Sequence, residues 1–506
     1  MNKIFKSSFL IILVILLSKI LGFIREFFIV YVFGVSVETD AFLIASVVPQ
    51  LLFSTIDLAF AAILIPIIQE IKINNREKLP GFILALSIST SIILLLVTGL
   101  GLIFNKNIIN LVAVGSNTNV KDLAIILTQV LMPMIIFQGI IQILIAVLRV
   151  LDRPIIGNFI GIPYNILIIF GIFLGKNYWG IYGVSVFILI GTALQSVLLI
   201  IYGLKFKVFE RFEFSEQKLY LKKVVILGVP TLFSTLFAQL QVISERILSS
   251  SLETGSITII FYVNKFFTLI VFILLTLINS ILYPQMSKWV LKESKGNFEE
   301  KINLIIKYVV IILIPISLFV CLNANGLISM VLGHGSLDEK SLYTISMGFG
   351  IIIVGLVGVI LKDILLKIFF SVQKVRIATH LSILSIIFNI VLSVILCNSF
   401  GIYGLIWSTP LSAYATCILL FYVLKQKMQM KIRIVLRLSE ILVFFSVNIL
   451  LYLGHNLIKL ISAGIYINVI LNGLYFLVII VFVYCFFMKM LPREELLYFK
   501  KGNEEN

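Results

Sequence analysis

Charged residues are scarce in this 506-residue chain, at 13% of the total, and metal-binding side chains are scarcer still. Soluble domains carry about 25% charged residues. The four cysteines and three histidines are scattered and have neither the spacing of zinc ligands nor that of a disulfide framework. The chain also lacks a glycine-rich phosphate loop. These absences exclude a soluble enzyme, a DNA-binding domain and a secreted disulfide scaffold, and we expect neither a metal site nor a cofactor.

Apolar residues are correspondingly abundant. They make up 60% of the chain, and the mean hydropathy is +1.14. A helix needs about 20 such residues to cross a bilayer. A hydropathy window predicts fourteen spans, at 7–33, 40–70, 80–104, 122–148, 155–175, 180–204, 224–248, 256–284, 303–322, 342–370, 378–397, 400–424, 438–455 and 463–488. The first range continues beyond its basic start with no small-residue cleavage site, so we interpret it as an uncleaved helix rather than a signal peptide.

The distribution of lysine and arginine predicts the orientation. With the N-terminus inside, 28 of the 40 lysines and arginines fall in cytoplasmic segments and 5 in external loops. This bias follows the positive-inside rule. It also explains most of the net charge of +16 without a nucleic-acid partner. We therefore expect a multi-pass protein of the bacterial cytoplasmic membrane with both termini cytoplasmic.

Two stretches of the chain echo each other. Tyr164-Asn165-Ile166-Leu167 leads into Gly180-Ile181-Tyr182-Gly183, and Phe388-Asn389-Ile390-Val391 leads into Gly401-Ile402-Tyr403-Gly404. A period near 220 residues covers six spans. The predicted fold is therefore an all-α polytopic membrane protein with two six-helix lobes in a parallel pseudo-two-fold repeat. The predicted domains are 1–215, 216–430, and 431–506 with two extra helices and a cytoplasmic tail.

Polar residues interrupt several apolar spans. On a helical wheel, Ser18, Lys19, Gly22, Arg25 and Glu26 lie within an arc of about 120°. Such a stripe is typical of a cavity face rather than a lipid face. Further candidate site residues within the later spans are Asp40, Asp57, Lys265, Lys362 and Lys367. Two more cations, Arg246 and Lys307, lie near span ends, and we expect them to snorkel to the membrane surface.

The deep cations outnumber the nearby acids. A cavity with net positive charge suits an anionic ligand, and arginine suits a phosphate in particular. The alternative is that these charges pair internally and only hold helices together. The two C-terminal helices are apolar and could carry a lipid tail, or could simply pad the bundle.

Several motifs resemble the MurJ (MviN) lipid II flippases of the MATE-like MOP exporter superfamily. The resemblance rests on Ser18 to Glu26, on Thr39-Asp40-Ala41-Phe42, on Phe261-Tyr262-Val263-Asn264-Lys265 and on Tyr283-Pro284-Gln285. Lys19 and Lys265 stand where the family has arginine, and Phe53-Ser54 stands where it has an arginine pair.

The resemblance implies a transporter rather than an enzyme. The expected function is to flip a polyprenyl-pyrophosphate-linked cell-wall precursor, lipid II first, across the cytoplasmic membrane by alternating access. A flippase for another lipid-linked polysaccharide unit, of capsule, O-antigen or teichoic type, is the alternative, and a cation-coupled drug exporter ranks behind it. The implied partners are an undecaprenyl-type lipid-linked sugar, membrane lipids and the cell-wall synthesis machinery, with no nucleic acid and a monomeric state.

The resemblance also suggests how transport is driven. Glu245, Asn389 and Thr409 stand near the places of a sodium site in some relatives, although Ser393 replaces a further carboxylate. The expected coupling is therefore to sodium, to protons or to the membrane potential.

Overall fold

The computed structural model describes residues 2–205, 214–432, 438–461 and 464–490. All regular elements in these residues are helices, which confirms the predicted all-α class. They form two compact units, of which the first holds Met1–Ile259 with Gly335–Ser341 and the second holds Ile260–His334 with Leu342–Asn506.

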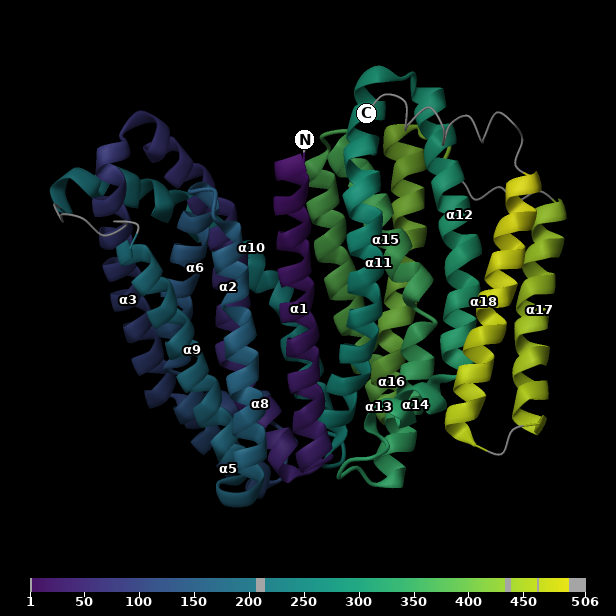
Figure 1. Ribbon diagram of the computed structural model, residues 1–506, viewed down its shortest axis with the longest axis horizontal. Coiled ribbons are helices and arrows are strands. Elements are labelled where there is room, and N and C mark those ends of the chain that lie inside the picture. Colours follow the sequence, from purple (N-terminus) through teal and green to yellow (C-terminus); the bar gives the residue numbers. More distant parts are fainter. Residues whose placement is uncertain (1, 206–213, 433–437, 462–463, 491–506) are drawn as a thin grey trace. The chain divides into compact units, whose positions relative to one another are not determined.

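The first unit is built from ten α-helices and one short 3₁₀ turn (Figure 1). They are α1 (Asn2–Phe33), α2 (Val37–Asn74), η1 (Arg76–Lys78), α3 (Leu79–Ile103), α4 (Asn105–Val112), α5 (Thr118–Leu131), α6 (Met134–Val150), α7 (Pro154–Phe159), α8 (Gly161–Tyr178), α9 (Gly180–Lys205) and α10 (Phe214–Ser250). Helix α11 (Ser256–Lys292) begins in this unit and continues in the second.

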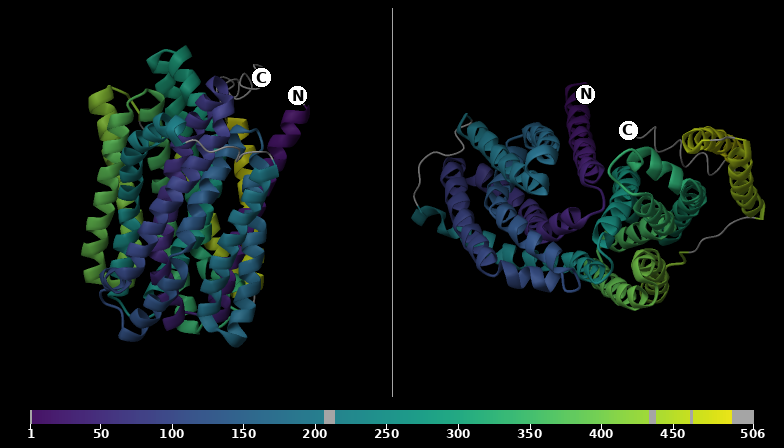
Figure 2. Two further views of the ribbon diagram at one scale, coloured as in Figure 1. Left: turned by 90° about the vertical axis from the view of Figure 1, so that its left-hand side faces the viewer. Right: turned by 90° about the horizontal axis from the view of Figure 1, so that it is seen from below.

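The second unit contains the remaining helices, except that α14 begins in the first unit. They are α12 (Lys295–Leu322), α13 (Ala324–Leu332), α14 (Glu339–Ile353), α15 (Leu356–Ser371), α16 (Val375–Met428), α17 (Leu438–Ile461) and α18 (Ile465–Met490). Helices α17 and α18 run side by side in every view (Figures 1 and 2). Phe319 on α12 stacks on Phe476 of α18 at a centroid distance of 4.3 Å, which ties this pair to the unit.

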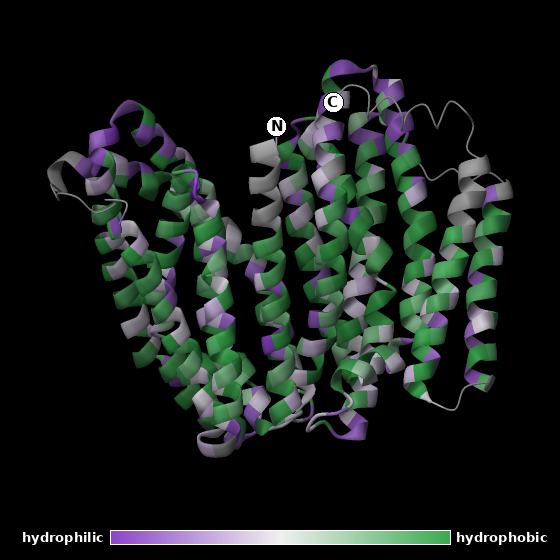
Figure 3. Ribbon diagram, in the orientation of Figure 1, coloured by the Kyte–Doolittle hydropathy of each residue, from purple (hydrophilic) through white to green (hydrophobic). Residues whose placement is uncertain are grey.

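The helices have the composition of membrane spans. Hydrophobic residues cover most of their length, and hydrophilic residues gather at the turns that join them (Figure 3). Among the described residues, nine helices are long and apolar enough to cross a membrane, or eleven if each of two bent pairs forms one span. Three further predicted spans fall on α1, which carries five charged residues, on the second half of α16, and on α18. The count of fourteen stays a prediction.

Backbone landmarks recur at equivalent places in the predicted repeat. Gly180 and Gly401, separated by 221 positions, both have positive φ, at 57° and 58°. Asp152 and Gln373, separated by the same number, both have φ of 59°. The bends between α5 and α6 and between α14 and α15 also match, at 42° and 40°. Because left-handed backbone is rare outside glycine, this agreement strongly supports the internal repeat.

Both non-glycine landmarks end a helix in the same way. The N–H of Arg153 donates to the carbonyl of Leu148 at 2.8 Å, and the N–H of Lys374 donates to the carbonyl of Phe369 at 2.8 Å. This bond, which spans five residues, defines a Schellman motif and satisfies a carbonyl that the helix end leaves open. It stops α6 and α15 at corresponding points.

The core of the first unit lies between α2, α3, α6, α9 and α10. Phe82 and Leu144 are fully or almost fully buried there, and Tyr220 of α10 packs its ring edge on Phe82 at 5.9 Å. At the same end of α10, Lys223 pairs with Glu70 of α2 at 2.6 Å. Helix α10 therefore packs in the first unit, although the repeat assigns it to the second lobe. The predicted lobe boundary at residue 215 stays a prediction.

The two cations that were expected to snorkel are buried instead. Arg246 is 7% exposed and donates to the carbonyl of Ile257 at 3.3 Å. Lys307 is 5% exposed and pairs with Glu440 of α17 at 2.6 Å. The snorkelling prediction was wrong because each cation has a partner contributed by another helix, α11 for Arg246 and α17 for Lys307.

Candidate functional site

Helix α1 presents its polar stripe to α8. The amide of Asn165 donates to the carbonyl of Ser18 at 3.3 Å and to that of Gly161 at 2.8 Å. A Cβ added to Gly22 would lie 3.7 Å from the Asn165 side-chain oxygen, so Gly22 also faces this asparagine. Asn165 itself is 5% exposed. The stripe is therefore anchored along the buried part of its length by one asparagine of the repeated motif.

Arg25 and Glu26 form an ion pair one turn further along α1. Their side chains are 17% and 9% exposed. The Arg25 guanidinium carbon also lies 5.6 Å from the ring centroid of Tyr164 on α8, a distance at which a cation is attracted to an aromatic face. The Nε–H of Arg25 is buried and has no hydrogen-bond partner among the described residues. Arg25 therefore retains one N–H that could donate a hydrogen bond to an anionic oxygen.

Lys19 and Asp57 belong to a second group of charges in the same unit. Asp57 on α2 is half-buried and lies within electrostatic range of Lys19 on α1 and Arg149 on α6. Both cations are exposed. Two cations against one carboxylate leave this group with a net positive charge. The structure thus brings Lys19 and Asp57 together and adds Arg149, which the sequence analysis counted only as a cytoplasmic cation.

Asp40 has a different environment. It is 2% exposed, and its carboxylate accepts from the N–H of Gly255 at 2.5 Å, from the N–H of Thr258 at 2.9 Å and from the Thr258 hydroxyl at 2.6 Å. A carboxylate at the first turn of a helix satisfies its open N–H groups and its positive dipole end. Asp40 of α2 therefore caps α11, and its predicted role in substrate binding stays a prediction.

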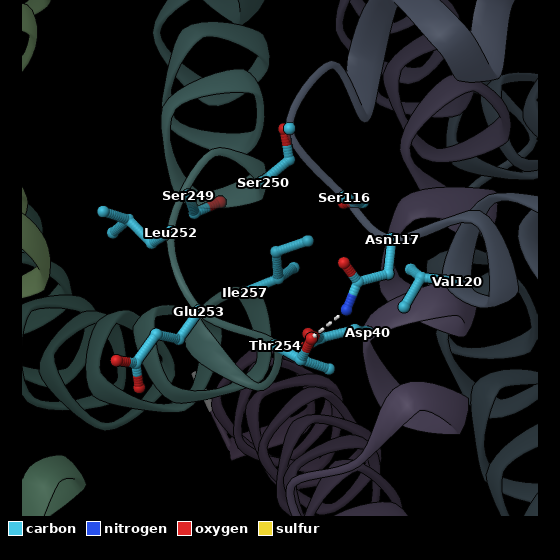
Figure 4. A pocket seen from close by; sticks show the side chains of 11 residues that line it. Asp40, Ser116, Asn117, Val120, Ser249, Ser250, Leu252, Glu253, Thr254 and Ile257 are labelled. Atoms are coloured by element: carbon cyan, nitrogen blue, oxygen red, sulfur yellow. Dashed lines mark hydrogen bonds between the residues drawn. The ribbon is translucent and has the colours of Figure 1, made fainter.

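A small pocket of about 200 Å³ lies beside this cap (Figure 4). Its lining comes from the α4–α5 and α10–α11 loops and from the adjoining ends of α2, α5, α10 and α11. Between the loops, the amide of Asn117 donates to the hydroxyl of Thr254 at 3.0 Å. Ser249 and Ser250 donate to carbonyls of their own helix, so the polar groups at the wall are largely engaged. The pocket is far too small for a lipid-linked disaccharide.

The candidate cations of the second unit are held by neighbours within it. Lys367 bonds to Asp363 at 2.6 Å and to Asn279. Lys265 lies 5.5 Å from the ring centroid of Phe261, one turn away on α11. Lys362 is half-buried on α15, with Asp363 and Cys417 as its electrostatic neighbours.

The predicted ion-site residues fall in both units. Glu245 is on α10 of the first unit, whereas Asn389 and Thr409 are on α16 of the second. Asn389 is buried and donates to the hydroxyl of Ser412 at 2.9 Å, and Ser393 donates to the hydroxyl of Ser408 at 2.8 Å. Within the described part of the chain, no three His, Cys, Asp or Glu side chains are grouped to hold a metal. The ion site stays a prediction.

Sequence reasoning missed Tyr164 and Thr258 as neighbours of the candidate residues. Tyr164 stands directly before Asn165 in the repeated motif, so the motif itself was the available signal. Thr258 lies 218 positions from Asp40, and nothing in the local pattern links the two.

Comparisons with known proteins point to one family. A family model described as lipid II flippase MurJ matches residues 29–491. A probable lipid II flippase MurJ of Buchnera aphidicola subsp. Schizaphis graminum is 27% identical over 433 residues, which cover 84% of each chain. Another from Thermotoga maritima is 24% identical over 481 residues, which cover 95% of each chain.

Solved structures resemble the fold as well. A lipid II flippase MurJ in an inward closed conformation superposes with a TM-score of 0.80 at 20% identity, over 95% of this chain and 100% of the other. An inward-facing multidrug resistance MATE transporter of the MOP superfamily gives a TM-score of 0.63 at 13% identity, over 80% and 94%.

Proposed function

This chain belongs to the lipid II flippase MurJ family, and we propose that it moves lipid II across the cytoplasmic membrane. The observation that carries the proposal is the family match, which extends over residues 29–491. The number of long apolar helices indicates that the protein is a multi-pass membrane protein. It is a transporter and not an enzyme.

The polar stripe of α1 is the proposed contact for the substrate diphosphate. Lipid II carries its anionic charge between a sugar headgroup and a polyprenyl tail, so a flippase must replace the water around that charge. Hydrogen bonds from a guanidinium to a phosphate are short and about twice as strong as neutral ones. Arg25 supports this role because its Nε–H is buried without a partner in the described residues. Lys19 and Arg149 add positive charge beside Asp57.

The remaining candidate residues complete the proposed cycle. Lys265, Lys362 and Lys367 provide the cations of the second unit, and Asp40 fixes the start of α11. The two units alternate between inward-open and outward-open states, while the undecaprenyl-type tail stays against the apolar helices α17 and α18. Both termini face the cytoplasm, the protein acts as a monomer near the cell-wall synthesis machinery, and sodium, protons or the membrane potential drive the cycle.

One observation favours a second candidate substrate. Phe53 and Ser54 stand on α2 where the resemblance implies an arginine pair, and both are half-buried. The loss of two cations would suit a different lipid-linked saccharide, such as a capsule, O-antigen or teichoic unit. The shared requirement is a polyprenyl diphosphate, so the headgroup distinguishes the two proposals.

A depletion experiment tests the function and the headgroup together. Bacterial cells depleted of their own lipid II flippase would express this chain or its Arg25→Ala variant, with membrane levels matched by immunoblot. We expect the wild type to restore growth and the exposure of lipid II on the outer leaflet, which a membrane-impermeant lipid II-binding probe measures. Persistent inner-leaflet lipid II at normal expression would contradict the proposal. If capsule or teichoic precursors alone were cleared, the second substrate would replace the first.

A further inference from the structure

Tyr164 occupies a fixed place between three helices of the first unit. It stands on α8, and its ring lies 5.6 Å from the guanidinium carbon of Arg25 on α1. The ring also contacts Gly191 of α9, where an added Cβ would lie 3.0 Å from Cδ2 and 3.3 Å from Cε2 of the ring. Gly191 is buried. The ring is therefore in close contact with the α9 backbone, and its movement toward α9 is restricted.

The contacts of Arg25 leave one N–H of the guanidinium without a partner in the described residues. Its terminal nitrogen bonds to Glu26, and its carbon lies 5.6 Å from the centroid of the Tyr164 ring. The guanidinium also interacts with Tyr164 through charge and through the side-chain hydroxyl. The Nε–H, in contrast, is buried without a partner in the described residues. Two contacts in different directions restrict the rotation of a planar group, so the direction of the remaining N–H is restricted too.

The second repeat does not reproduce this arrangement. Phe388 stands at the position equivalent to Tyr164 and is 44% exposed. Ser412 stands at the position equivalent to Gly191, and its hydroxyl accepts from Asn389. A supported aromatic ring is thus a feature of the first repeat, where the arginine is, rather than a general feature of the fold.

We propose that Tyr164 is a positioning residue for transport. It holds the Arg25 guanidinium so that the Nε–H donates to a diphosphate oxygen of the substrate, and Gly191 fixes the place of the ring. Tyr164 acts through Arg25 and does not itself touch the substrate. This inference rests on the proposed function, because it takes a polyprenyl-diphosphate-linked sugar as the ligand.

Binding of lipid II to the purified full-length protein in detergent tests the inference. We expect Tyr164→Leu to weaken binding roughly 2- to 30-fold, the range of a cation–π contact. Tyr164→Phe keeps the ring and removes only the hydroxyl interaction with Arg25, so it should lose less affinity than Tyr164→Leu. In an Arg25→Ala background, Tyr164→Leu should have no further effect, since the residue through which it acts is gone.

Gly191→Ala provides a second variant that leaves both Tyr164 and Arg25 in place. It should shift the ring by a few tenths of an ångström and weaken binding, but have no effect when Tyr164 is already Leu. Gly99→Ala on α3 is the matched control, because nothing lies within 4 Å of the added Cβ. Thermal unfolding of each variant verifies that the protein is folded.

The outcomes separate the two proposals. Unchanged binding by Tyr164→Leu, or an equal loss with and without Arg25, would overturn the positioning role while leaving the function intact. Equal losses for Tyr164→Leu and Tyr164→Phe would also overturn it, because the ring would not be the supporting group. A wild type that binds neither lipid II nor undecaprenyl diphosphate would overturn the proposed function and this inference together.

Discussion

The two repeats share their backbone landmarks but differ in what their equivalent asparagines bind. Asn165 donates to the backbone of α1, at the carbonyl of Ser18. Asn389 donates to Ser412 within its own helix hairpin. Gly180 and Gly401 nonetheless have almost the same φ. The two repeats therefore share their backbone geometry, whereas their equivalent polar side chains form hydrogen bonds with different partners.

One buried ion pair from each unit also shows that similar groups have different partners. In the first unit, Arg25 pairs with a residue adjacent in sequence and keeps a donor without a partner in the described residues. In the second, Lys307 pairs with Glu440 across α12 and α17. The Lys307–Glu440 pair joins two helices and therefore stabilises the bundle, whereas the Arg25–Glu26 pair joins neighbours on one helix. We infer that Arg25 of the first unit contributes more to substrate binding and that Lys307 of the second unit contributes more to stability.

The largest expected effect comes from breaking the pair between α12 and α17. Its side chains are 6% and 10% exposed, so Lys307→Met would remove the cation that pairs with the buried Glu440 carboxylate. Such losses cost about 3–5 kcal/mol of unfolding free energy. Unfolding in detergent micelles measures this, and Lys307→Met combined with Glu440→Leu should recover much of the loss.

A surface pair provides the control. Lys340 and Glu253 are 85% and 87% exposed and 3.7 Å apart, so Lys340→Met should change stability by about 0–1 kcal/mol. Equal effects of Lys307→Met and Lys340→Met would contradict the structural role of the buried pair.

A smaller effect, equal in the two repeats, is expected at the glycines with positive φ that the two repeats share. Gly180 and Gly401 both have φ near 60°, and nothing but one Glu38 oxygen at 3.7 Å lies near an added Cβ. Alanine at either position should therefore cost only backbone strain, about 1–3 kcal/mol. The two unfolding curves should shift alike. A large difference between them would mean that the repeats do not share this geometry.

The smallest predicted effect concerns the start of α14. Asp338 is exposed, and its carboxylate accepts from the N–H of Ser341 at 3.2 Å, as an N-cap does. Asp338→Ala should cost about 1 kcal/mol, measured by hydrogen exchange in the first turn of α14. Asp338→Asn keeps an acceptor and should cost less, and equal exchange in wild type and the alanine variant would argue against the cap.

The same cap has a pH dependence of known sign. Hydrogen bonding to Ser341 lowers the pKa of Asp338 below its ordinary value of 3.8. Its stabilising contribution is therefore fully present above that ordinary value and is lost as the pH falls through the lower folded pKa. The protection of the first-turn amides of α14, expressed relative to their intrinsic exchange rates at each pH, should fall on acidification in the wild type and stay flatter in Asp338→Asn.

The spans, the repeat and the polar stripe of α1 could be predicted because each depends on a pattern of residues that are close in sequence. Hydropathy gives the spans, and the paired motifs around Gly180 and Gly401 give the repeat. The cap of α11 by Asp40 could not be predicted, because its partner Thr258 is 218 positions away. The burial of Lys307 escaped prediction for a similar reason, since Glu440 belongs to another helix.

The most direct test measures lipid II flipping by purified protein in vesicles, normalised to folded protein. Arg25→Ala should lose at least about tenfold of the rate, since a hydrogen bond to a charged group contributes about 1.5–3 kcal/mol. The Lys307→Met and Glu440→Leu double variant should keep its rate. Full activity of Arg25→Ala, with loss of activity in the folded double variant, would contradict the assignment of substrate binding to the first unit.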